Sequence, residues 1–256
     1  MKRRFASLIA HVALVVGLLA LWEVAVSDSR RLMFLFGSPS AILRAAATDI
    51  QTAPFWQDVL ATASVTLIGL AAGTVLGAAL GLAIWVHPRV ATFMRPYILA
   101  AGALPIFALA PMLIIWFGVG LMPKIVMASF SVLLVMIIGT YSLARDAHAD
   151  HEEWMTGLSM SRGMRLRLVV IPVVLDGVLV IMARSVGIAI VATFIGEFIA
   201  SQNGLGRYIL KSGGLYDMPR VLFGIVALAL LSLLISETIS AIARLRHRSP
   251  ATETAI

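Results

Sequence analysis

A polar segment interrupts an otherwise apolar chain between Ala144 and Pro172, with the sequence ARDAHADHEEWMTGLSMSRGMRLRLVVIP. Imidazole and carboxylate groups of the kind that bind metals are concentrated in it, at Asp146, His148, Asp150, His151, Glu152 and Glu153. Their spacing matches no specific ligand pattern, and a solvated surface explains them more simply. We therefore expect neither a metal site nor a bound cofactor, and we interpret the segment as a place where an aqueous partner acts.

The chain has no nucleotide-binding motif. The nearest approach to a phosphate-binding loop is GLGRYILKSGG, from Gly204 to Gly214. Such a loop needs glycine at positions 205 and 210 to bring Lys211 and Ser212 to a phosphate, and both positions are leucine. The absence of cysteine excludes disulfides, thiolate metal sites and cysteine nucleophiles. The chain is not expected to be an enzyme, so ATP-driven movement of a solute would need a separate ATPase.

The composition places these residues in a membrane protein. Hydrophobic residues make up 60% of the 256 positions, the mean hydropathy is +0.97, and several stretches reach the roughly 20 residues that a spanning helix needs. The apolar run from Phe5 to Val26 is longer than a signal-peptide core and no A-x-A site follows it, so we expect an uncleaved first span. We predict one all-α transmembrane domain over 1–256, with six spans at about 6–26, 59–86, 96–118, 125–143, 173–199 and 221–243.

The charge distribution predicts an orientation. A formal charge of +7 could indicate nucleic acid, but the arginines cluster at the ends of apolar spans, where a basic excess records topology. With the N-terminus inside, the inner segments carry twelve of the 20 Lys and Arg residues and the outer segments carry seven. We therefore expect no nucleic-acid partner, and we expect both termini and the segment 144–172 in the cytoplasm.

Two of the spans carry residues that shape a helix bundle. The second has small residues at four-residue steps, which let helix backbones approach closely and indicate a helix inside a bundle: Gly69, Gly73, Gly77 and Gly81. The third contains Pro105 and Pro111. Each proline removes a backbone donor, and such breaks survive where protein or a water-filled cavity satisfies the freed carbonyls. A transport path and a plain kink both remain open for this span.

Charged residues also lie inside or near the ends of the spans. Arg184 is near the middle of the fifth span, where it could pair with another helix or contact an anionic solute. Asp176 lies about 80° away around the helix, which allows only a loose pair. Glu197 and Glu237 lie nearer span ends, where we expect their side chains to reach the membrane interface.

Within the polar segment we predict a short amphipathic helix from about Asp146 to Met155, a turn near Gly157, and a second helical stretch from Met164 to Pro172. A short helix held between two spans could transmit a push from a docked partner. The alternative is an ordinary connection, for which this length and charge would be unusual.

This segment resembles the coupling loop of ABC importer permeases, whose pattern runs E-A-A, three residues, G, nine more, then an apolar residue, any residue, an apolar residue and P. Alignment on Val169, Ile171 and Pro172 puts the first Glu at Glu153 and the glycine at Ser159. Met160-Ser161-Arg162 then falls where that family often has a small residue, Ser and Arg. The sequence departs from the pattern at Trp154 and Met155, which replace the alanines, and at Ser159 and Met160.

Three further stretches are similar to the nitrate, sulfonate and taurine branch of that family. Gly37-Ser38-Pro39-Ser40 is similar to its P-S-P-S entry, and Leu104 to Ile125 is similar to its proline-containing third span ending in W-F-G. Gly196-Glu197 followed by Asn203-Gly204-Leu205-Gly206 is similar to its outer loop after the fifth span. The resemblance covers about Phe36 to Leu210, in the expected order.

The resemblance implies a type I importer permease that works as a homodimer, with two cytoplasmic ABC ATPase subunits and an extracytoplasmic solute-binding protein. It implies import of a small anionic solute of the sulfonate, nitrate or taurine kind across the inner membrane, in contact with membrane lipid. For coupling to the ATPase we select Glu153, Trp154, Met155, Ser159 and Arg162, and for the translocation path Pro105, Pro111 and Arg184. The competing classes are a carrier or channel driven by an ion gradient without an ATPase, and a non-transporting membrane scaffold.

Overall fold

The computed structural model describes residues 2–27, 29–103 and 105–247, so both ends of the expected 1–256 domain, including Arg248, lie outside the described residues. Within these ranges the regular elements are all helical. The α-helices are α1 (Lys2–Ser27), α2 (Arg30–Phe36), α3 (Pro39–Asp49), α4 (Ala53–Val86), α5 (Pro88–Ala103), α6 (Ala110–Phe117), α7 (Leu121–Asp150), α8 (Glu152–Gly157), α9 (Arg162–Arg165), α10 (Ile171–Ala200), α11 (Leu205–Gly214) and α12 (Met218–His247).

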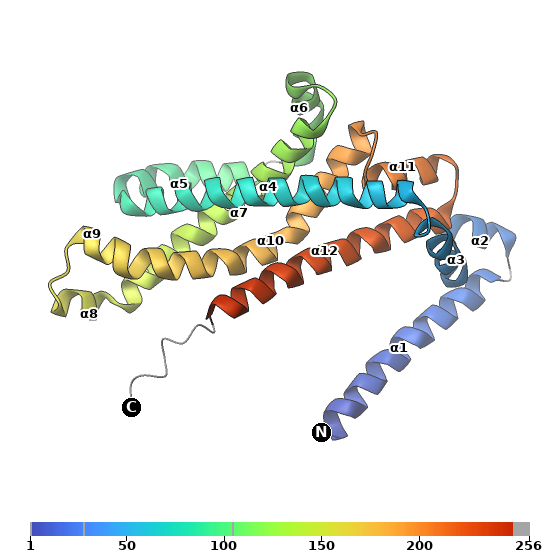
Figure 1. Ribbon diagram of the computed structural model, residues 1–256, viewed down its shortest axis with the longest axis horizontal. Helices are drawn as coiled ribbons and strands as arrows, with labels where there is room; N and C mark the ends of the chain where they lie inside the picture. The colour runs from blue at the N-terminus through green and yellow to red at the C-terminus, as the bar shows by residue number, and fades with distance from the viewer. Residues whose placement is uncertain (1, 28, 104, 248–256) are drawn as a thin grey trace.

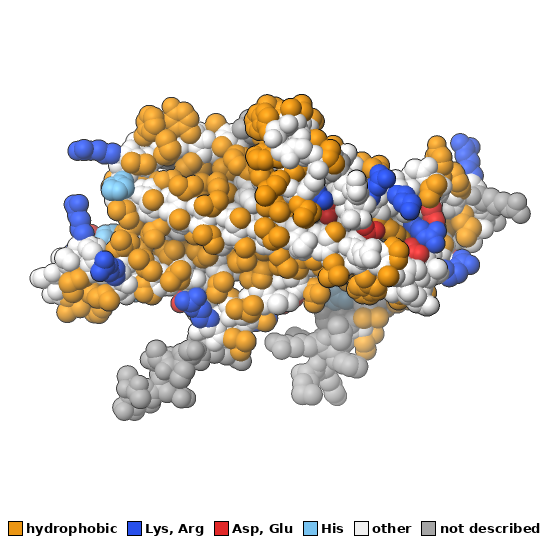
Figure 2. Space-filling view, turned by 45° about the horizontal axis from the view of Figure 1, so that its top comes forward, with side chains coloured by type: hydrophobic (Ala, Val, Ile, Leu, Met, Phe, Trp, Pro, Cys, Tyr) orange, Lys and Arg blue, Asp and Glu red, His pale blue; other side chains and the backbone are white. Residues whose placement is uncertain are grey.

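Five stretches of the described helices are long and apolar enough to cross a bilayer, at Ile9–Ser27, Ala53–Val86, Leu121–Asp150, Arg162–Ile199 and Met218–Arg246. Figure 1 shows α4, α10 and α12 running lengthwise beside one another, and α7 packs between α4 and α10. In Figure 2 apolar side chains cover the middle of the bundle, and Lys and Arg gather toward its two ends. This distribution fits a bundle that spans a membrane.

The predicted single span at 96–118 is wrong. The structure divides this region into α5, which already begins at Pro88, a 3-10 turn at Ile106–Leu109, and α6. Pro105 precedes the 3-10 turn and Pro111 lies in the first turn of α6, where a missing N–H costs no helical hydrogen bond. Figure 1 shows α6 projecting away from the line of α5. The prolines thus break this segment, and the other five predicted spans correspond to continuous helices.

The glycine stripe of α4 is an interhelical contact surface, as predicted. A Cβ atom at Gly73 would lie 2.5 Å from the Ser129 carbonyl oxygen of α7, and one at Gly77 would lie 2.6 Å from the Leu133 carbonyl oxygen. Such distances exclude any side chain unless the two backbones separate. The stripe therefore fixes α4 against α7, the central helix of the bundle.

Replacing Gly77 by Ala is expected to lower the thermal midpoint of the protein, because its methyl group would meet both a backbone oxygen and the Met136 Cβ at 2.6 Å. Overpacking of this kind costs about 1–3 kcal/mol. Thermal melting of the detergent-purified protein measures the effect. The matched control is Gly17→Ala in α1, where no atom lies within 4 Å of the new methyl group, and an equal loss in both variants would contradict this assignment.

Helix α1 lies apart from the other spans. It packs mainly against α2 and α3, and Figure 1 shows the rest of its length diverging from the bundle. Glu23 joins α1 to α3, because its carboxylate accepts hydrogen bonds from the Ser40 backbone N–H at 2.9 Å and the Ser40 hydroxyl at 2.8 Å. Most of the described side chains of α1 are exposed, so this helix has apolar surface to offer to lipid or to a second subunit.

Candidate functional site

The polar segment forms a compact helical connection between α7 and α10. The predicted helix from Asp146 to Met155 is wrong, because α7 continues in helical register to Asp150 and breaks at His151, after which α8 begins. The predicted turn follows Gly157. The predicted second stretch starts earlier than Met164, at Arg162, where the Ser161 hydroxyl caps the helix by accepting from the Met164 N–H at 3.3 Å. A π-helical turn at Leu166–Val170 then leads directly into α10.

Internal contacts hold this connection in one shape. Met155 is fully buried, and its carbonyl accepts a hydrogen bond from the Met160 N–H at 3.0 Å. The Arg165 guanidinium, which the sequence did not single out, donates to the Met160 carbonyl at 3.0 Å. Ser159, which lies between Met155 and Met160 in the chain, has a φ of +50°, in the left-handed region that glycine adopts most easily. The resemblance places a glycine at this position, and the backbone here follows that expectation although the residue is serine.

The candidate coupling residues divide between an outward and an inward set. Glu153, Ser159 and Arg162 are exposed, and the Trp154 side chain is 57% exposed. Leu158, which follows α8, is also 57% exposed, so two large apolar side chains are exposed on this connection. Met155 is different, because its buried side chain packs on the inner side of α8 and is not accessible to a partner. The structure thus places Glu153, Trp154, Ser159 and Arg162 on the outside of one folded connection and Met155 in its interior.

Of the candidate path residues, Pro105 lines a cavity of about 560 Å3 between α5, α7 and α10. Pro111 lies in α6, and neither it nor Arg184 is among the residues that line this cavity. The walls of the cavity include Ser131, Leu134, Val135 and Ile138 of α7 and Gly187, Ile188 and Val191 of α10.

Arg184 lies one helical turn from Gly187 and Ile188, on the exposed side of α10. Within the described part of the chain its guanidinium makes no ion pair or hydrogen bond. The loose pair with Asp176 does not form, since the Asp176 carboxylate lies 3.3 Å from Arg246 of α12 instead. A charge in a spanning helix usually faces the interior of a bundle or a water-filled cavity.

The opposite end of the bundle holds a buried carboxylate, and the expectation that Glu197 reaches the interface is wrong. Glu197 has no exposed surface. The Thr62 hydroxyl of α4 donates to this carboxylate, whose two oxygens both lie 2.9 Å away, and the Gly206 N–H of α11 donates at 2.9 Å. Lys124 of α7 is 96% buried nearby, and its ammonium group donates to the Ser201 hydroxyl at 2.9 Å.

These groups together hold the start of α11. Thr62 accepts a hydrogen bond from the Leu205 N–H at 2.8 Å, and Asp58 accepts one from the Gly204 N–H at 2.7 Å. The first three N–H groups of the helix thus find acceptors on α4 and α10, which satisfies donors that a helix leaves unpaired. A Cβ atom at Gly204 would lie directly against the Glu197 carboxyl group, and one at Gly206 would lie 2.7 Å from the Glu197 Cβ, so both positions require glycine.

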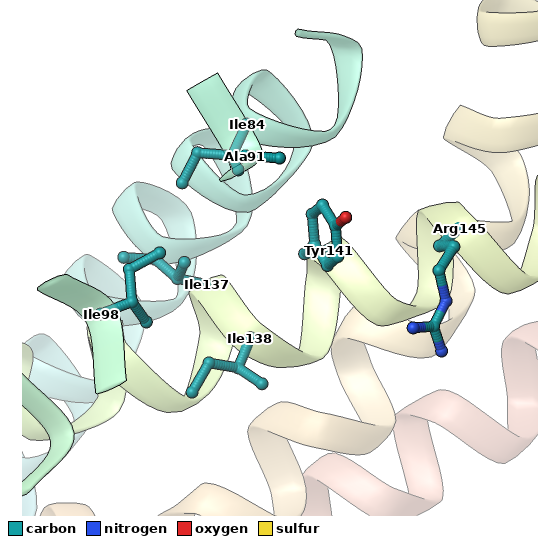
Figure 3. A pocket seen from close by; sticks show the side chains of 7 residues that line it. All are labelled: Ile84, Ala91, Ile98, Ile137, Ile138, Tyr141 and Arg145. Atoms are coloured by element: carbon teal, nitrogen blue, oxygen red, sulfur yellow. The ribbon is translucent and has the colours of Figure 1, made fainter. Parts of the chain in front are cut away.

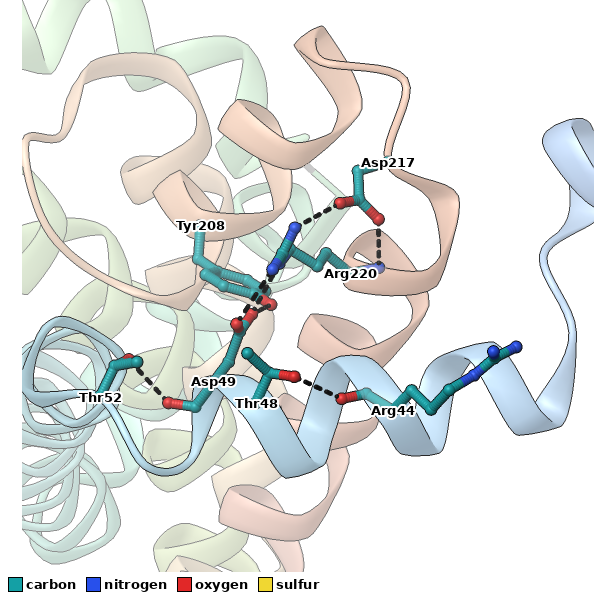
Figure 4. A network of polar contacts seen from close by, with 7 residues as sticks. All are labelled: Arg44, Thr48, Asp49, Thr52, Tyr208, Asp217 and Arg220. Atoms are coloured by element: carbon teal, nitrogen blue, oxygen red, sulfur yellow. Dashed lines mark hydrogen bonds and ion pairs between the residues drawn. The ribbon is translucent and has the colours of Figure 1, made fainter.

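A second polar cluster ties α3 to α11 and α12 at the same end (Figure 4). The Asp49 carboxylate accepts hydrogen bonds from the Tyr208 hydroxyl at 2.5 Å and from the Arg220 Nε at 2.9 Å, and Arg220 also pairs with Asp217 at 2.6 Å. Burial and the adjacent Asp49 carboxylate raise the pKa of the Tyr208 phenol well above its ordinary value. Together the two clusters fix this end of the bundle around α11.

Five spanning helices, a proline-broken sixth segment beside a cavity, and a folded polar connection at one end define a multi-pass, all-α membrane protein. Residues 73–248 match the family described as "Binding-protein-dependent transport system inner membrane component". The chain belongs to this family and is a permease subunit of an ABC importer.

Similarity to individual proteins extends over most of the chain. The chain is 26% identical over 220 residues to the "Formylaminopyrimidine transport permease protein ThiX" of Halalkalibacterium halodurans, and the match covers 85% of this chain and 86% of the relative. It is 28% identical over 217 residues to the "Riboflavin transport system permease protein RibX" of Chloroflexus aurantiacus, covering 84% and 81%. It is 25% identical over 244 residues to the "Taurine transport system permease protein TauC" of Escherichia coli, covering 91% and 88%.

The fold is that of type I importer permeases. A chain of the MetNI methionine ABC transporter in an inward-facing conformation superposes with a TM-score of 0.66 at 17% identity, covering 77% of this chain and 98% of that one. The predicted fold class and family are therefore confirmed. The taurine relative matches the predicted branch, but the relatives carry names of several different solutes.

Proposed function

We propose that this permease imports a small anionic solute into the cytoplasm, driven by a separate ABC ATPase that docks on α8 and supplied by an extracytoplasmic solute-binding protein. The observation that carries the proposal is the connection between α7 and α10. Met155 anchors it and Trp154 and Glu153 project from it, so it offers a partner a preformed surface. A preformed surface loses little conformational entropy on binding, which favours stable docking.

In the mechanism, ATP binding closes the ATPase pair and moves the two docked α8 helices. Because Arg165 and Met155 hold α8 within its connection, the movement passes to α7 and α10, which line the cavity at Pro105. The path would then open to the outside of the membrane, and after hydrolysis it would open to the cytoplasm again. Coupling requires that bound solute and binding protein interact differently with the two states.

The proposed path follows one face of α10. Arg184, Gly187, Ile188 and Val191 are all exposed and recur at three- and four-residue steps, so they form one stripe beside the cavity. Arg184 is the candidate contact for the anionic group of the solute, because its guanidinium has no partner among the described residues. The taurine transport name of one relative supports an acidic solute group.

A homodimer would cover this open stripe, since a second copy facing α10 would enclose the path. The exposed length of α1 offers a second subunit additional apolar surface. The excess of Lys and Arg in alternate connections supports cytoplasmic termini and a cytoplasmic α8.

Replacing Arg184 by Gln is expected to lower ATP-driven uptake of the solute by roughly ten- to a hundredfold, because a hydrogen bond to a charged group contributes about 1.5–3 kcal/mol. The solute is first identified by calorimetry on the cognate binding protein. Arg184→Lys should retain much of the uptake, and Arg207→Gln, an exposed arginine of α11, serves as the matched control. Unchanged uptake by Arg184→Gln would contradict the anionic path.

A further inference from the structure

A groove separate from the proposed docking surface opens beside α7, toward the α8 end of the bundle (Figure 3). It has a volume of about 270 Å3 and lies between α5, the end of α4 and α7. Ile84, Ala91, Ile98, Ile137 and Ile138 form its walls, and Tyr141 and Arg145 continue along α7 beyond them. The groove is therefore aliphatic over most of its length and polar at one end.

The polar end offers the groups that bind a phosphate. Tyr141 and Arg145 both line this end of the groove, and they leave α7 one helical turn apart, with the Tyr141 hydroxyl and the Arg145 guanidinium pointing in different directions (Figure 3). The Tyr141 hydroxyl has no hydrogen-bond partner among the described residues, and Arg145 supplies a guanidinium whose planar donors suit phosphate oxygens. Water alone would be a poor occupant of the aliphatic part, because it would find no hydrogen-bond partners there.

We propose that this groove binds an anionic phospholipid, with part of an acyl chain against the isoleucines and the phosphate at Tyr141 and Arg145. Basic pockets between spanning helices bind acidic lipid headgroups in this way. The aromatic pair Phe93 and Tyr97 on the exposed side of α5, with ring centroids 5.3 Å apart, is typical of a helix near the membrane interface. The inference requires that the bundle lies in a bilayer and that this face of α5 and α7 is open to lipid, and it stands whether or not the ATPase assignment is correct.

Asp146 competes with the lipid for the same guanidinium. Its carboxylate lies 3.0 Å from Arg145, but the two side chains are 56% and 62% exposed. An exposed pair of this kind contributes little and exchanges readily with another anion. A free anion has the same access to Arg145 but gains nothing from the isoleucine walls, so the apolar groove favours the lipid over inorganic phosphate.

The test uses the purified full-length chain in nanodiscs that contain equal amounts of phosphatidylglycerol and phosphatidylcholine, with the lipids retained on release counted by native mass spectrometry. The wild-type chain should retain phosphatidylglycerol preferentially. Arg145→Gln should reduce that preference about fivefold, the factor that one surface cation contributes to attraction of acidic lipid. Asp146→Asn should increase it, because the competing carboxylate is gone.

Two further variants isolate the site. Ile98→Trp should fill the groove and remove the retained lipid, whereas Ile138 is avoided because it also lines the path cavity. The control is Arg244→Gln, since Arg244 is an exposed α12 arginine paired with Glu237 at 3.5 Å and should leave retention unchanged. If Ile98→Trp fails to fold, the Arg145 and Asp146 variants still decide the question.

Four results would overturn the proposal. Equal retention of the two lipids by the wild-type chain, or equal losses in Arg145→Gln and Arg244→Gln, would show no specific acidic-lipid site. Displacement of the lipid by millimolar inorganic phosphate would indicate a free-anion site. Disulfide-linked dimers of Ile98→Cys, readily detected because the wild-type chain has no cysteine, would show that a second copy covers the groove.

Discussion

The double substitution Glu153→Lys and Trp154→Ala is expected to abolish capture of the cognate ATPase while leaving the permease folded. Trp154 is the large, 57% exposed aromatic side chain of α8, and truncation of such an anchor typically costs 2 kcal/mol or more, about thirtyfold in the dissociation constant. Reversal of the adjacent Glu153 charge adds repulsion against any basic group that meets it. Co-purification with tagged ATPase and the dissociation constant measured in detergent report the result.

The control for this substitution is Glu237→Lys, which reverses another exposed glutamate, on α12. It should leave ATPase binding unchanged, and both proteins should elute as the wild type does on size exclusion. If the double variant bound the ATPase with unchanged affinity, α8 would not be the docking surface. An equal loss in Glu237→Lys would show a general charge effect instead.

Replacing Glu197 by Ala is expected to destabilise the end of the bundle where α11 lies. The carboxylate accepts from Thr62 and from the Gly206 N–H in a site with no exposed surface, and its loss leaves buried donors unpaired and Lys124 without a nearby anion. Each buried donor left unpaired costs about 1–3 kcal/mol. Thermal melting and limited proteolysis after Lys211 measure the loss, which should appear as a lower midpoint and earlier cleavage.

Graded variants make the Glu197 prediction sharper. Glu197→Gln retains an acceptor oxygen and should lose less stability than Glu197→Ala. Thr62→Val removes the hydroxyl that bridges Glu197 and the Leu205 N–H, so it should show an intermediate loss. A midpoint for Glu197→Ala equal to that of the exposed control Glu237→Ala would contradict the role of this carboxylate.

Features that depend on local sequence were predictable. The four-residue glycine spacing indicates a close helix contact because helical geometry alone puts those positions on one face. Pro105 and Pro111 indicated a disturbed helix, but the prediction kept 96–118 as one span, whereas the structure divides it into α5, a 3-10 turn and α6. The position of the polar connection followed from its charge. Its helix boundaries did not, because α7 continues without a break from the predicted end of the span at 143 to Asp150.

The buried polar clusters were not predictable, since their partners are far apart in the chain. Thr62 and Glu197 are separated by 135 positions, and Tyr208 and Asp49 by 159. The nearest signal was the resemblance around Gly196-Glu197 and Gly204-Leu205-Gly206. It indicated an outer loop, but it did not indicate which groups accept hydrogen bonds from the start of α11. Similarly, no periodicity distinguishes the buried Met155 from the exposed Trp154, because only the folded connection decides which side faces inward.

The structure also accounts for two departures from the coupling-loop pattern. Met155 stands where the pattern has alanine and fills the interior of the connection. Ser159 stands where the pattern has glycine and adopts the left-handed backbone that glycine would favour. The connection therefore keeps its expected shape with different side chains. Trp154 is the departure that faces outward, and it enlarges the exposed surface that we propose as the ATPase docking site.

ATP-dependent uptake into proteoliposomes tests the central claim most directly. The permease is reconstituted alone, with the ATPase, and with the ATPase and the solute-binding protein loaded with its labelled solute. The account predicts uptake only in the complete system with ATP, and none from the Glu153→Lys, Trp154→Ala variant. Uptake by the permease alone, driven by an imposed ion gradient and indifferent to the ATPase, would contradict it.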